Sequence, residues 1–296
     1  MQPAAQHVAV LTCDPARPAL EARLVESLRD AWGGGAARWL MRGAAAEFAL
    51  PSVPDAFEDT RAQMDALGFD LNVVSAGGRR KRLLLADMDS TMIRQECIDE
   101  LAAEAGVGEQ VAAITARAMN GEVDFEGALI ERARLLEGLP VSVIDKVWAE
   151  RIEPMPGGRA LVATMRAHGA RAVLVSGGFT SFTERVAAML GFDEHRANGL
   201  LARGGALTGE VGRPILGREA KVAALEEAAA RLGIAERDAI AVGDGANDLG
   251  MLERAGMGVA LHAKPAVQAR ARLRVNHGDL TALLFLQGYG AEEFAA

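Results

Sequence analysis

Residues 83–91 read LLLADMDST: four apolar residues followed directly by an aspartate, a methionine, a second aspartate, a serine and a threonine. A short continuous apolar run is typical of a strand that is buried on both faces, as in a parallel sheet. In open parallel sheets the ligand site forms outside the carboxyl ends of the strands. Asp87 and Asp89 therefore stand where a ligand site is expected.

The chain downstream of this run alternates between strand and helix patterns. Strands are predicted at residues 172–175, 240–242 and 258–261, and helices at 160–168, 182–190, 221–232 and 248–255. Such alternation predicts an α/β fold with a right-handed, doubly wound parallel sheet. Helical patterns fill residues 93–153, between the first strand and the next. We expect them to form a helical cap inserted into the sheet domain.

A different pattern precedes the run. Strands are predicted at residues 7–13, 37–42, 47–50 and 69–75, and helices at 19–32 and 56–67, which gives the order βαββαβ. A Gly77-Gly78 turn and four basic residues, 79–82, follow. Glycine turns commonly separate units, so we expect a small α+β domain at residues 1–80 and a larger domain at 81–296. The basic run is equally compatible with a solvated turn.

Residues that can carry chemistry recur at the predicted strand ends and helix starts. They are Asp87, Asp89, Ser176, Gly177, Lys221, Asp244, Asn247 and Asp248. Taken singly, each has an ordinary structural explanation, since Asp, Ser and Thr start helices and Gly-Gly marks turns. Independent caps and turns have no reason to share one edge of a sheet. Their common placement therefore predicts one site.

Clustered aspartates need a compensating cation, because like charges repel and burial of an uncompensated carboxylate is costly. Oxygen ligands without His or Cys favour Mg²⁺ over Zn²⁺. A calcium-binding EF-hand is the rival interpretation. It requires Asp or Asn at the third loop position and Gly at the sixth. Met92 and Ala246 occupy the sixth and third positions of the two candidate loops, so neither fits.

Composition narrows the class of protein. The chain has 296 residues, with 32 basic and 40 acidic side chains and a net charge of −8. The chain has no Lys/Arg-rich block of the kind that binds nucleic acid, and no apolar run is long enough to span a membrane. The basic start of a signal peptide is also missing, because no Lys or Arg precedes Arg17. The cysteines are Cys13 and Cys97, too few for a disulfide framework, which favours a reducing compartment such as the cytoplasm. A small-molecule enzyme or a non-catalytic binding protein remains.

The motifs together resemble the haloacid dehalogenase superfamily of aspartate-nucleophile phosphatases and, within it, the phosphoserine phosphatase family. The resemblance runs from about residue 83 to residue 289. The matching segments are residues 87–91, 96–102, 118–121, 124–125, 176–180, 219–221, 243–249, 262–265 and 276–280. It implies Mg²⁺-dependent hydrolysis of O-phospho-L-serine, the last step of serine biosynthesis.

The resemblance also implies a role for each residue of the predicted site. Asp87 is the expected nucleophile, which forms an aspartyl-phosphate, and Asp89 the expected proton donor and acceptor. Asp87, the Asp89 backbone carbonyl and Asp244 are the expected magnesium ligands, with Asp248 supporting water molecules or Lys221 from outside the metal's own ligands. The expected phosphate-binding groups are Ser176, Gly177, Lys221 and Asn247. A relative acting on another small phosphomonoester such as phosphohomoserine, or transferring the phosphoryl group, is the alternative.

Two cap residues and the N-terminal domain complete these expectations. Glu96 matches the family position that holds the substrate ammonium, and Arg132 matches the position that holds the substrate carboxylate. Without the resemblance, both residues would be interpreted as ordinary surface charges on helices. The N-terminal order resembles the small ligand-binding ACT domain, which makes an amino-acid effector an expectation. The alternative role of this unit is to form a homodimer or simply to stabilise the chain. Gly121 and the turn at residues 154–158 are candidate hinges for the cap.

Overall fold

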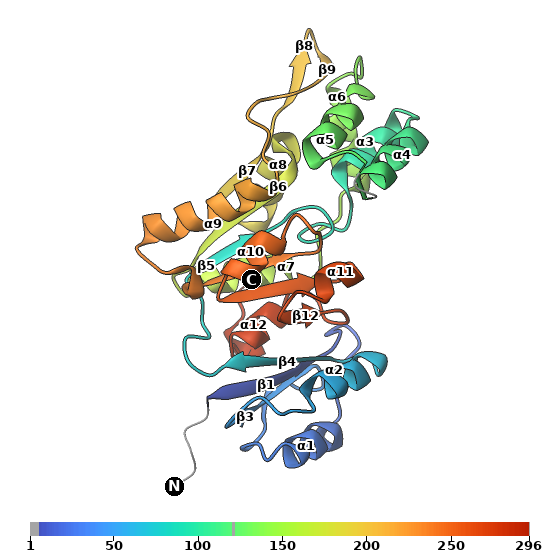
Figure 1. Ribbon diagram of the computed structural model, residues 1–296. Helices are drawn as coiled ribbons and strands as arrows, with labels where there is room; N and C mark the ends of the chain where they lie inside the picture. The colour runs from blue at the N-terminus through green and yellow to red at the C-terminus, as the bar shows by residue number, and fades with distance from the viewer. Residues whose placement is uncertain (1–5, 120–121, 296) are drawn as a thin grey trace.

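An antiparallel sheet at the N-terminus and a larger parallel sheet organise the computed structural model, which describes residues 6–119 and 122–295 (Figure 1). Asn120 and the hinge candidate Gly121 lie outside the described residues. The elements of the N-terminal unit are β1 (His7–Thr12), α1 (Ala22–Ala31), β2 (Arg38–Met41), β3 (Ala45–Leu50), α2 (Phe57–Ala66) and β4 (Asp70–Ser75). This is the predicted βαββαβ order.

The second unit begins with β5 (Leu83–Ala86) and continues through the cap helices α3 (Cys97–Glu104), α4 (Gly108–Met119), α5 (Phe125–Arg134) and α6 (Ser142–Arg151). After the cap come α7 (Gly158–Ala167), β6 (Arg171–Phe179), α8 (Thr180–Leu190), β7 (Glu194–Asn198), β8 (Leu200–Arg203), β9 (Ala206–Val211), α9 (Arg218–Leu232), β10 (Ala239–Gly243), α10 (Leu249–Arg254), β11 (Met257–Leu261), α11 (Pro265–Gln268), β12 (Leu273–Val275) and α12 (Ala282–Leu286). Short 3₁₀ turns occupy Glu236–Asp238 and Ala291–Glu293.

The parallel sheet has the strand order β12-β11-β10-β5-β6-β7. All four residues of β5 are buried, and the strand pairs in parallel with β10 on one side and β6 on the other. Leu84 shares one core with Leu161 of α7, and Leu83 shares another with Leu225 of α9. Helices therefore cover both faces of β5, which explains its unbroken apolar sequence. The doubly wound parallel fold predicted from the sequence is confirmed.

The N-terminal sheet has the order β2-β3-β1-β4 and is covered differently on its two faces. Leu11 and Phe48 pack with Met64 of α2 in a core of their own. Val10, on the opposite face, shares a core with Phe285 of α12. The sheet therefore lies between its own helices and the C-terminal part of the chain, as Figure 1 shows.

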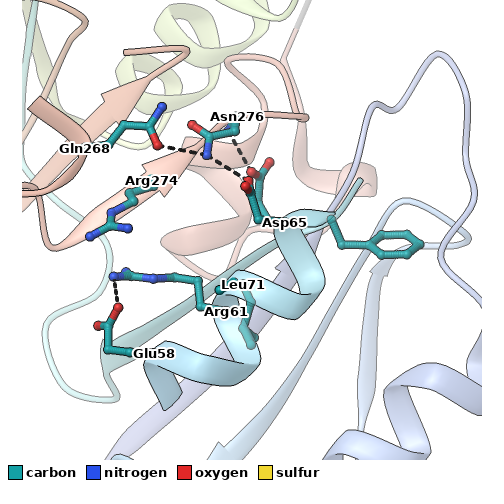
Figure 2. A pocket seen from close by; sticks show the side chains of 10 residues that line it. Glu58, Arg61, Asp65, Leu71, Gln268, Arg274 and Asn276 are labelled. Atoms are coloured by element: carbon teal, nitrogen blue, oxygen red, sulfur yellow. Dashed lines mark hydrogen bonds and ion pairs between the residues drawn. The ribbon is translucent and has the colours of Figure 1, made fainter. Parts of the chain in front are cut away.

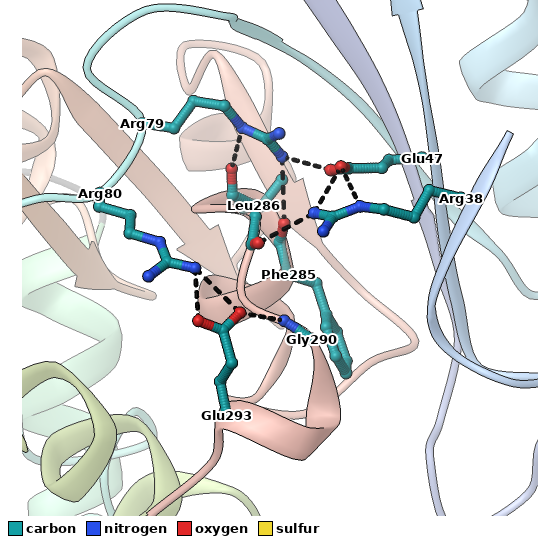
Figure 3. Close-up of polar contacts among 9 residues, drawn as sticks. Arg38, Glu47, Arg79, Arg80, Phe285, Leu286, Gly290 and Glu293 are labelled. Atoms are coloured by element: carbon teal, nitrogen blue, oxygen red, sulfur yellow. Dashed lines mark hydrogen bonds and ion pairs between the residues drawn. The ribbon is translucent and has the colours of Figure 1, made fainter. Parts of the chain in front are cut away.

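The predicted boundary at residues 77–82 contributes side chains that join the N-terminal sheet to the C-terminal part of the chain. Arg79 is largely buried and pairs with Glu47 of β3 at 2.7 Å, while its guanidinium also donates to the carbonyls of Phe285 and Leu286 (Figure 3). Arg80 pairs with Glu293 at 2.6 Å. The basic run is thus not simply a solvated turn. The domain limits of 1–80 and 81–296 remain predictions.

The cap lies at the opposite end of the molecule from the N-terminal sheet (Figure 1). Its two connections run side by side, since Ile93 and Pro154 form a bridge and Met155 N–H donates to the carbonyl of Met92 at 2.9 Å. The hairpin of β8 and β9 packs beside it, and Leu207 N–H donates to the carbonyl of Leu139 at 2.8 Å. The cap limits of 93–153 and the hinge at residues 154–158 remain predictions.

Among the described residues, no helix combines the length and the apolar character needed to cross a membrane.

Candidate active site

The carboxyl ends of β5 and β10 bring two of the predicted motifs together. Asp87 follows β5 directly, and its N–H donates to the carbonyl of Val242 in β10 at 3.0 Å, which extends the ladder by one residue. Asp244 follows β10 in the same way. Carboxylate oxygens of Asp87, Asp244 and Asp248 all lie within 4.8 Å of one another. The sequence expectation of one acidic cluster at this sheet edge agrees with the geometry.

Lys221, in the first turn of α9, is the fixed positive charge of the cluster. Its Nζ lies 2.6 Å from Asp87 Oδ1 and 2.6 Å from Asp248 Oδ1, and its side chain is only 2 % exposed. Burial works to lower the pKa of Lys221, but the charges of Asp248 and Asp87 outweigh it and raise the pKa. Lys221 therefore stays an ammonium despite its burial.

One ammonium does not balance three carboxylates. Burial, followed by the charge of Asp248, raises the pKa of Asp87 well above its usual range and that of Asp244 to about 6. A divalent cation among these oxygens would relieve the repulsion. The donors are all oxygen, as hard cations such as Mg²⁺ require. Asp87, Asp244 and Asp248 can therefore hold a metal ion, and the 2.6 Å contact between Asp248 and Lys221 is compatible with the supporting role expected of Asp248.

Asp89 is not one of these three carboxylates and contacts both the cap and β6. Its Oδ1 accepts a hydrogen bond from the Cys97 N–H at the start of α3 at 3.0 Å, and its Oδ2 accepts one from Ser176 Oγ at 3.3 Å. Burial, followed by the charge of Glu96, raises the pKa of Asp89 to about 6. The two aspartates of the motif thus occupy different environments, which suits different protonation states.

Ser176 and Gly177 do not follow β6 as predicted but form part of it, because the strand runs on to Phe179 with a shift of register after Val175. The irregularity turns this segment toward the site. Gly178 N–H donates to Ser176 Oγ at 2.8 Å. A Cβ at Gly177 would lie 2.8 Å from the ring of Phe125 in the cap. Only glycine permits this close approach.

Asn198, at the end of β7, holds this segment and was missed by the sequence analysis. Its Nδ2 donates to the carbonyl of Gly177 at 2.9 Å, and its Oδ1 accepts from the N–H of Leu216 at 2.7 Å. It is 1 % exposed. Phe125 was quoted only as part of a motif and received no role. Neither position carries a local sequence signal that distinguishes it from an ordinary strand or helix residue.

The two ends of the loop after β10 lie close together. A Cβ at Gly243 would lie 2.3 Å from Cγ of Asp248, so a side chain there would displace that carboxylate. Asp248 is held by the N–H of Gly245, which donates to its Oδ2 at 2.9 Å. Asn247 lies in the same loop, half-buried. The first residue of the loop, Asp244, is joined to Lys264, whose N–H donates to its carbonyl at 3.4 Å.

Glu96 and Arg132 come from different cap helices and converge near Asp89. Glu96 directly precedes α3 without a side-chain capping hydrogen bond, and it accepts a hydrogen bond from Ser90 Oγ at 2.8 Å. Arg132 is half-buried in α5. Burial lowers its pKa, while the charges of Asp99, Glu96 and Asp89 act to raise it. The structure therefore places a cation and an anion on the cap, close to Asp89, rather than two unrelated surface charges.

Comparison with known proteins assigns this arrangement to a family. Residues 84–253 match the haloacid dehalogenase-like hydrolase family, and this match covers more than half of the 296 residues. The chain belongs to the haloacid dehalogenase-like hydrolases. The matched region of this hydrolase spans the sheet from β5 to α10 and includes the whole cap.

Individual relatives of this hydrolase agree with the assignment. A phosphoserine phosphatase from Streptomyces coelicolor is 46 % identical over 78 % of this chain and 57 % of its own length. A haloacid dehalogenase family hydrolase from Salmonella enterica serovar Typhi has a TM-score of 0.85 at 31 % identity, covering 95 % of this chain and 98 % of its own. A substrate-bound phosphoserine phosphatase has a TM-score of 0.65 at 39 % identity, covering 69 % and 97 %. The chain spans between about half and two thirds of the length of the first curated relatives it matches.

Proposed function

We propose that this hydrolase is a phosphoserine phosphatase, which converts O-phospho-L-serine and water to L-serine and phosphate. The observation that carries the proposal is the pair of opposite charges on the cap, Arg132 and Glu96, beside the catalytic aspartates. A substrate with a carboxylate, an ammonium and a phosphate complements these charges. The names of the relatives, among them the Streptomyces coelicolor enzyme, support the same substrate.

The proposed reaction has two steps, and Asp87 acts in both. In the first, a carboxylate oxygen of Asp87 bonds to phosphorus while the bond from phosphorus to the serine oxygen breaks, and Asp89 gives its proton to that oxygen. In the second, Asp89 takes a proton from water, the water oxygen bonds to phosphorus, and Asp87 is released. The raised pKa of Asp89, about 6, favours its first role, since the group readily carries a proton.

The charge that develops on the phosphoryl oxygens needs fixed donors. Lys221, buried between Asp87 and Asp248, is held in place for this task, and Ser176, the Gly177 N–H and Asn247 are proposed to assist it. A Mg²⁺ ion held by Asp87, Asp244 and Asp248, with the predicted carbonyl of Asp89, would supply charge neutralisation and orientation. Phe125, whose ring lies next to Gly177, would keep water from the phosphate.

The cellular setting is a further proposal. Both cysteines are free and buried, which supports a reducing compartment such as the cytoplasm. A homodimer and an amino-acid effector bound to the N-terminal ACT-like domain remain predictions. Nucleic acid and membrane are not expected as partners.

A hydrolysis screen tests the proposed function. The full chain is incubated with phosphoserine, phosphothreonine, phosphohomoserine and sugar phosphates, with Mg²⁺ or with EDTA, and released phosphate is measured. Phosphoserine should give the highest kcat/KM, and EDTA should remove the activity. A preference for phosphohomoserine, or a phosphorylated acceptor in place of free phosphate, would favour the alternative substrate or phosphoryl transfer.

Replacement of Arg132 by alanine should affect substrates selectively. For phosphoserine kcat/KM should fall by about 100-fold, because a charge-assisted pair with the substrate carboxylate is lost. For p-nitrophenyl phosphate, which has no carboxylate, it should change by less than about threefold. The matched control is Arg134→Ala on the exposed face of the same helix, which should affect neither. Equal losses on both substrates would show that Arg132 does not bind the carboxylate.

A further inference from the structure

Two polar clusters lie outside the acidic cluster of the candidate active site. The first surrounds a cavity of about 180 Å³ between α2 of the N-terminal unit and β12 of the parallel sheet, beside Arg274 (Figure 2). Side chains that line it contact one another: Arg61 pairs with Glu58, and Asn276 Nδ2 donates to Asp65 Oδ1 at 2.9 Å. These side chains belong to the contact between the two units. The second cluster lies where the chain enters the cap, and it centres on Ser90.

Ser90, within the motif at residues 87–91, has an unusual backbone conformation. Its φ angle is +54°, in the left-handed region that glycine adopts freely and that a Cβ atom makes unfavourable. Among the non-glycine residues that the structure describes, only Ser90 and His262 have a positive φ. Backbone strain of this kind persists where surrounding contacts hold it in place, and it is concentrated at functional sites. The serine hydroxyl is therefore expected to make a contact that glycine could not.

The hydroxyl of Ser90 contacts the cap. Its Oγ donates to Oε1 of Glu96 at 2.8 Å, and the Ser90 N–H donates to the carbonyl of Gln95 at 3.2 Å. The two hydrogen bonds close the loop between the motif and the start of α3. Glu96 is exposed to solvent, so water could satisfy its carboxylate without Ser90. The bond therefore adds little to folding, and its main effect is to fix the direction of the carboxylate.

Neighbouring residues of the motif hold neighbouring residues of the cap. Asp89 Oδ1 accepts a hydrogen bond from the Cys97 N–H at 3.0 Å, next to the bond between Ser90 and Glu96. The two contacts fix Glu96 relative to Asp89, the proposed proton donor to the serine oxygen. In phosphoserine only two carbon atoms separate that oxygen from the ammonium nitrogen. A substrate so short requires the two carboxylates to be set at one separation.

We propose that Ser90 is a positioning residue that makes this hydrolase selective for phosphoserine, because its hydroxyl holds the Glu96 carboxylate where the substrate ammonium binds. This inference rests on the proposed function. Glycine at position 90 would relax the backbone but would leave Glu96 free to turn into solvent. The serine thus maintains selectivity in spite of the strain that its own side chain creates.

Two substitutions of Ser90 separate the hydroxyl from the backbone. Both Ser90→Ala and Ser90→Gly remove the hydrogen bond to Glu96, but only glycine relieves the strain at positive φ. The ratio of kcat/KM for phosphoserine to that for p-nitrophenyl phosphate should fall by about tenfold in both. The midpoint of thermal unfolding should be higher for Ser90→Gly than for Ser90→Ala. Ser52→Ala, at an exposed serine of the N-terminal unit, is the matched control and should keep the wild-type ratio.

A double variant shows whether Ser90 acts through Glu96. In a Glu96→Gln background, the further change Ser90→Ala should lower kcat/KM for phosphoserine no more than for p-nitrophenyl phosphate, because the two residues act as one unit. An equal loss of selectivity in both backgrounds would overturn the inference, and so would wild-type selectivity in either single variant of Ser90. A wild type that does not prefer phosphoserine would instead contradict the proposed function itself, and with it the role of Glu96.

Discussion

Replacement of Asp87 by asparagine is expected to abolish phosphate release, with kcat for phosphoserine falling by about 10⁴-fold or more. An amide has no anionic oxygen with which to attack phosphorus. The fold should persist, because the side chain keeps its volume and Lys221 keeps its 2.6 Å contact with Asp248. Removal of one of three clustered carboxylates also relieves repulsion. The measurements are phosphate release and the midpoint of thermal unfolding.

A covalent label makes this result specific. Wild-type protein quenched during turnover of ³²P-phosphoserine should retain radioactive phosphate, and the Asp87→Asn protein should retain none. Asp55→Asn, in an exposed loop of the N-terminal unit, is the matched control and should behave as the wild type. Labelled Asp87→Asn protein, or one with substantial phosphatase activity, would contradict the assignment of the nucleophile.

The centre of the fold could be predicted because its strands are buried on both faces. Strands such as β5 and β10 then have short apolar runs, and the polar residues that follow them mark the sheet edge. Asp87 and Asp244 were located in this way. The role of Lys221 was harder to predict, because a lysine at the start of a helix is usually solvated. Only its place among the other motifs singled it out.

The edge of the sheet was not predictable by the same signal. The sequence of β7 is EHRAN, without an apolar run. An edge strand is partly exposed to solvent, so few of its side chains need to be apolar. Asn198 at its end was missed with it. The β8–β9 hairpin was missed as well, although Gly204 and Gly205, both with positive φ, form the glycine pair that commonly marks a hairpin turn.

Contacts between distant segments were the other limit. Nothing near Arg79 in the sequence indicates that Glu47 and the carbonyls after Leu284 surround it. The cavity beside Arg274 depends in the same way on α2, about 210 residues earlier in the chain, as the 211-residue separation of the Arg61–Arg272 contact illustrates. Such a partner is specified by tertiary packing, which a local pattern does not encode. Family resemblance could identify Glu96 and Arg132 but not these contacts.

Replacement of Lys221 by methionine should destabilise the protein by about 3–5 kcal/mol in EDTA, because it leaves buried carboxylates without their ammonium. Asp87 and Asp248 are 8 % and 0 % exposed, so water cannot replace the lost partner. Methionine fills nearly the same volume, which separates the charge from the packing. Mg²⁺ should restore part of the loss, since a cation that binds only the folded state stabilises it. Urea unfolding with EDTA and with Mg²⁺ measures both effects.

The double variant Lys221→Met/Asp248→Asn decides whether charge is the cause. Asparagine at position 248 still offers an oxygen to the Gly245 N–H but no longer carries a charge, so at least half of the lost stability should return. Activity should not return, because the proposed phosphate-binding ammonium is still missing. A single variant as stable as the wild type would show that Lys221 does not compensate the cluster. A double variant no more stable than the single one would assign the loss to packing, and the buried ammonium would then matter for catalysis alone.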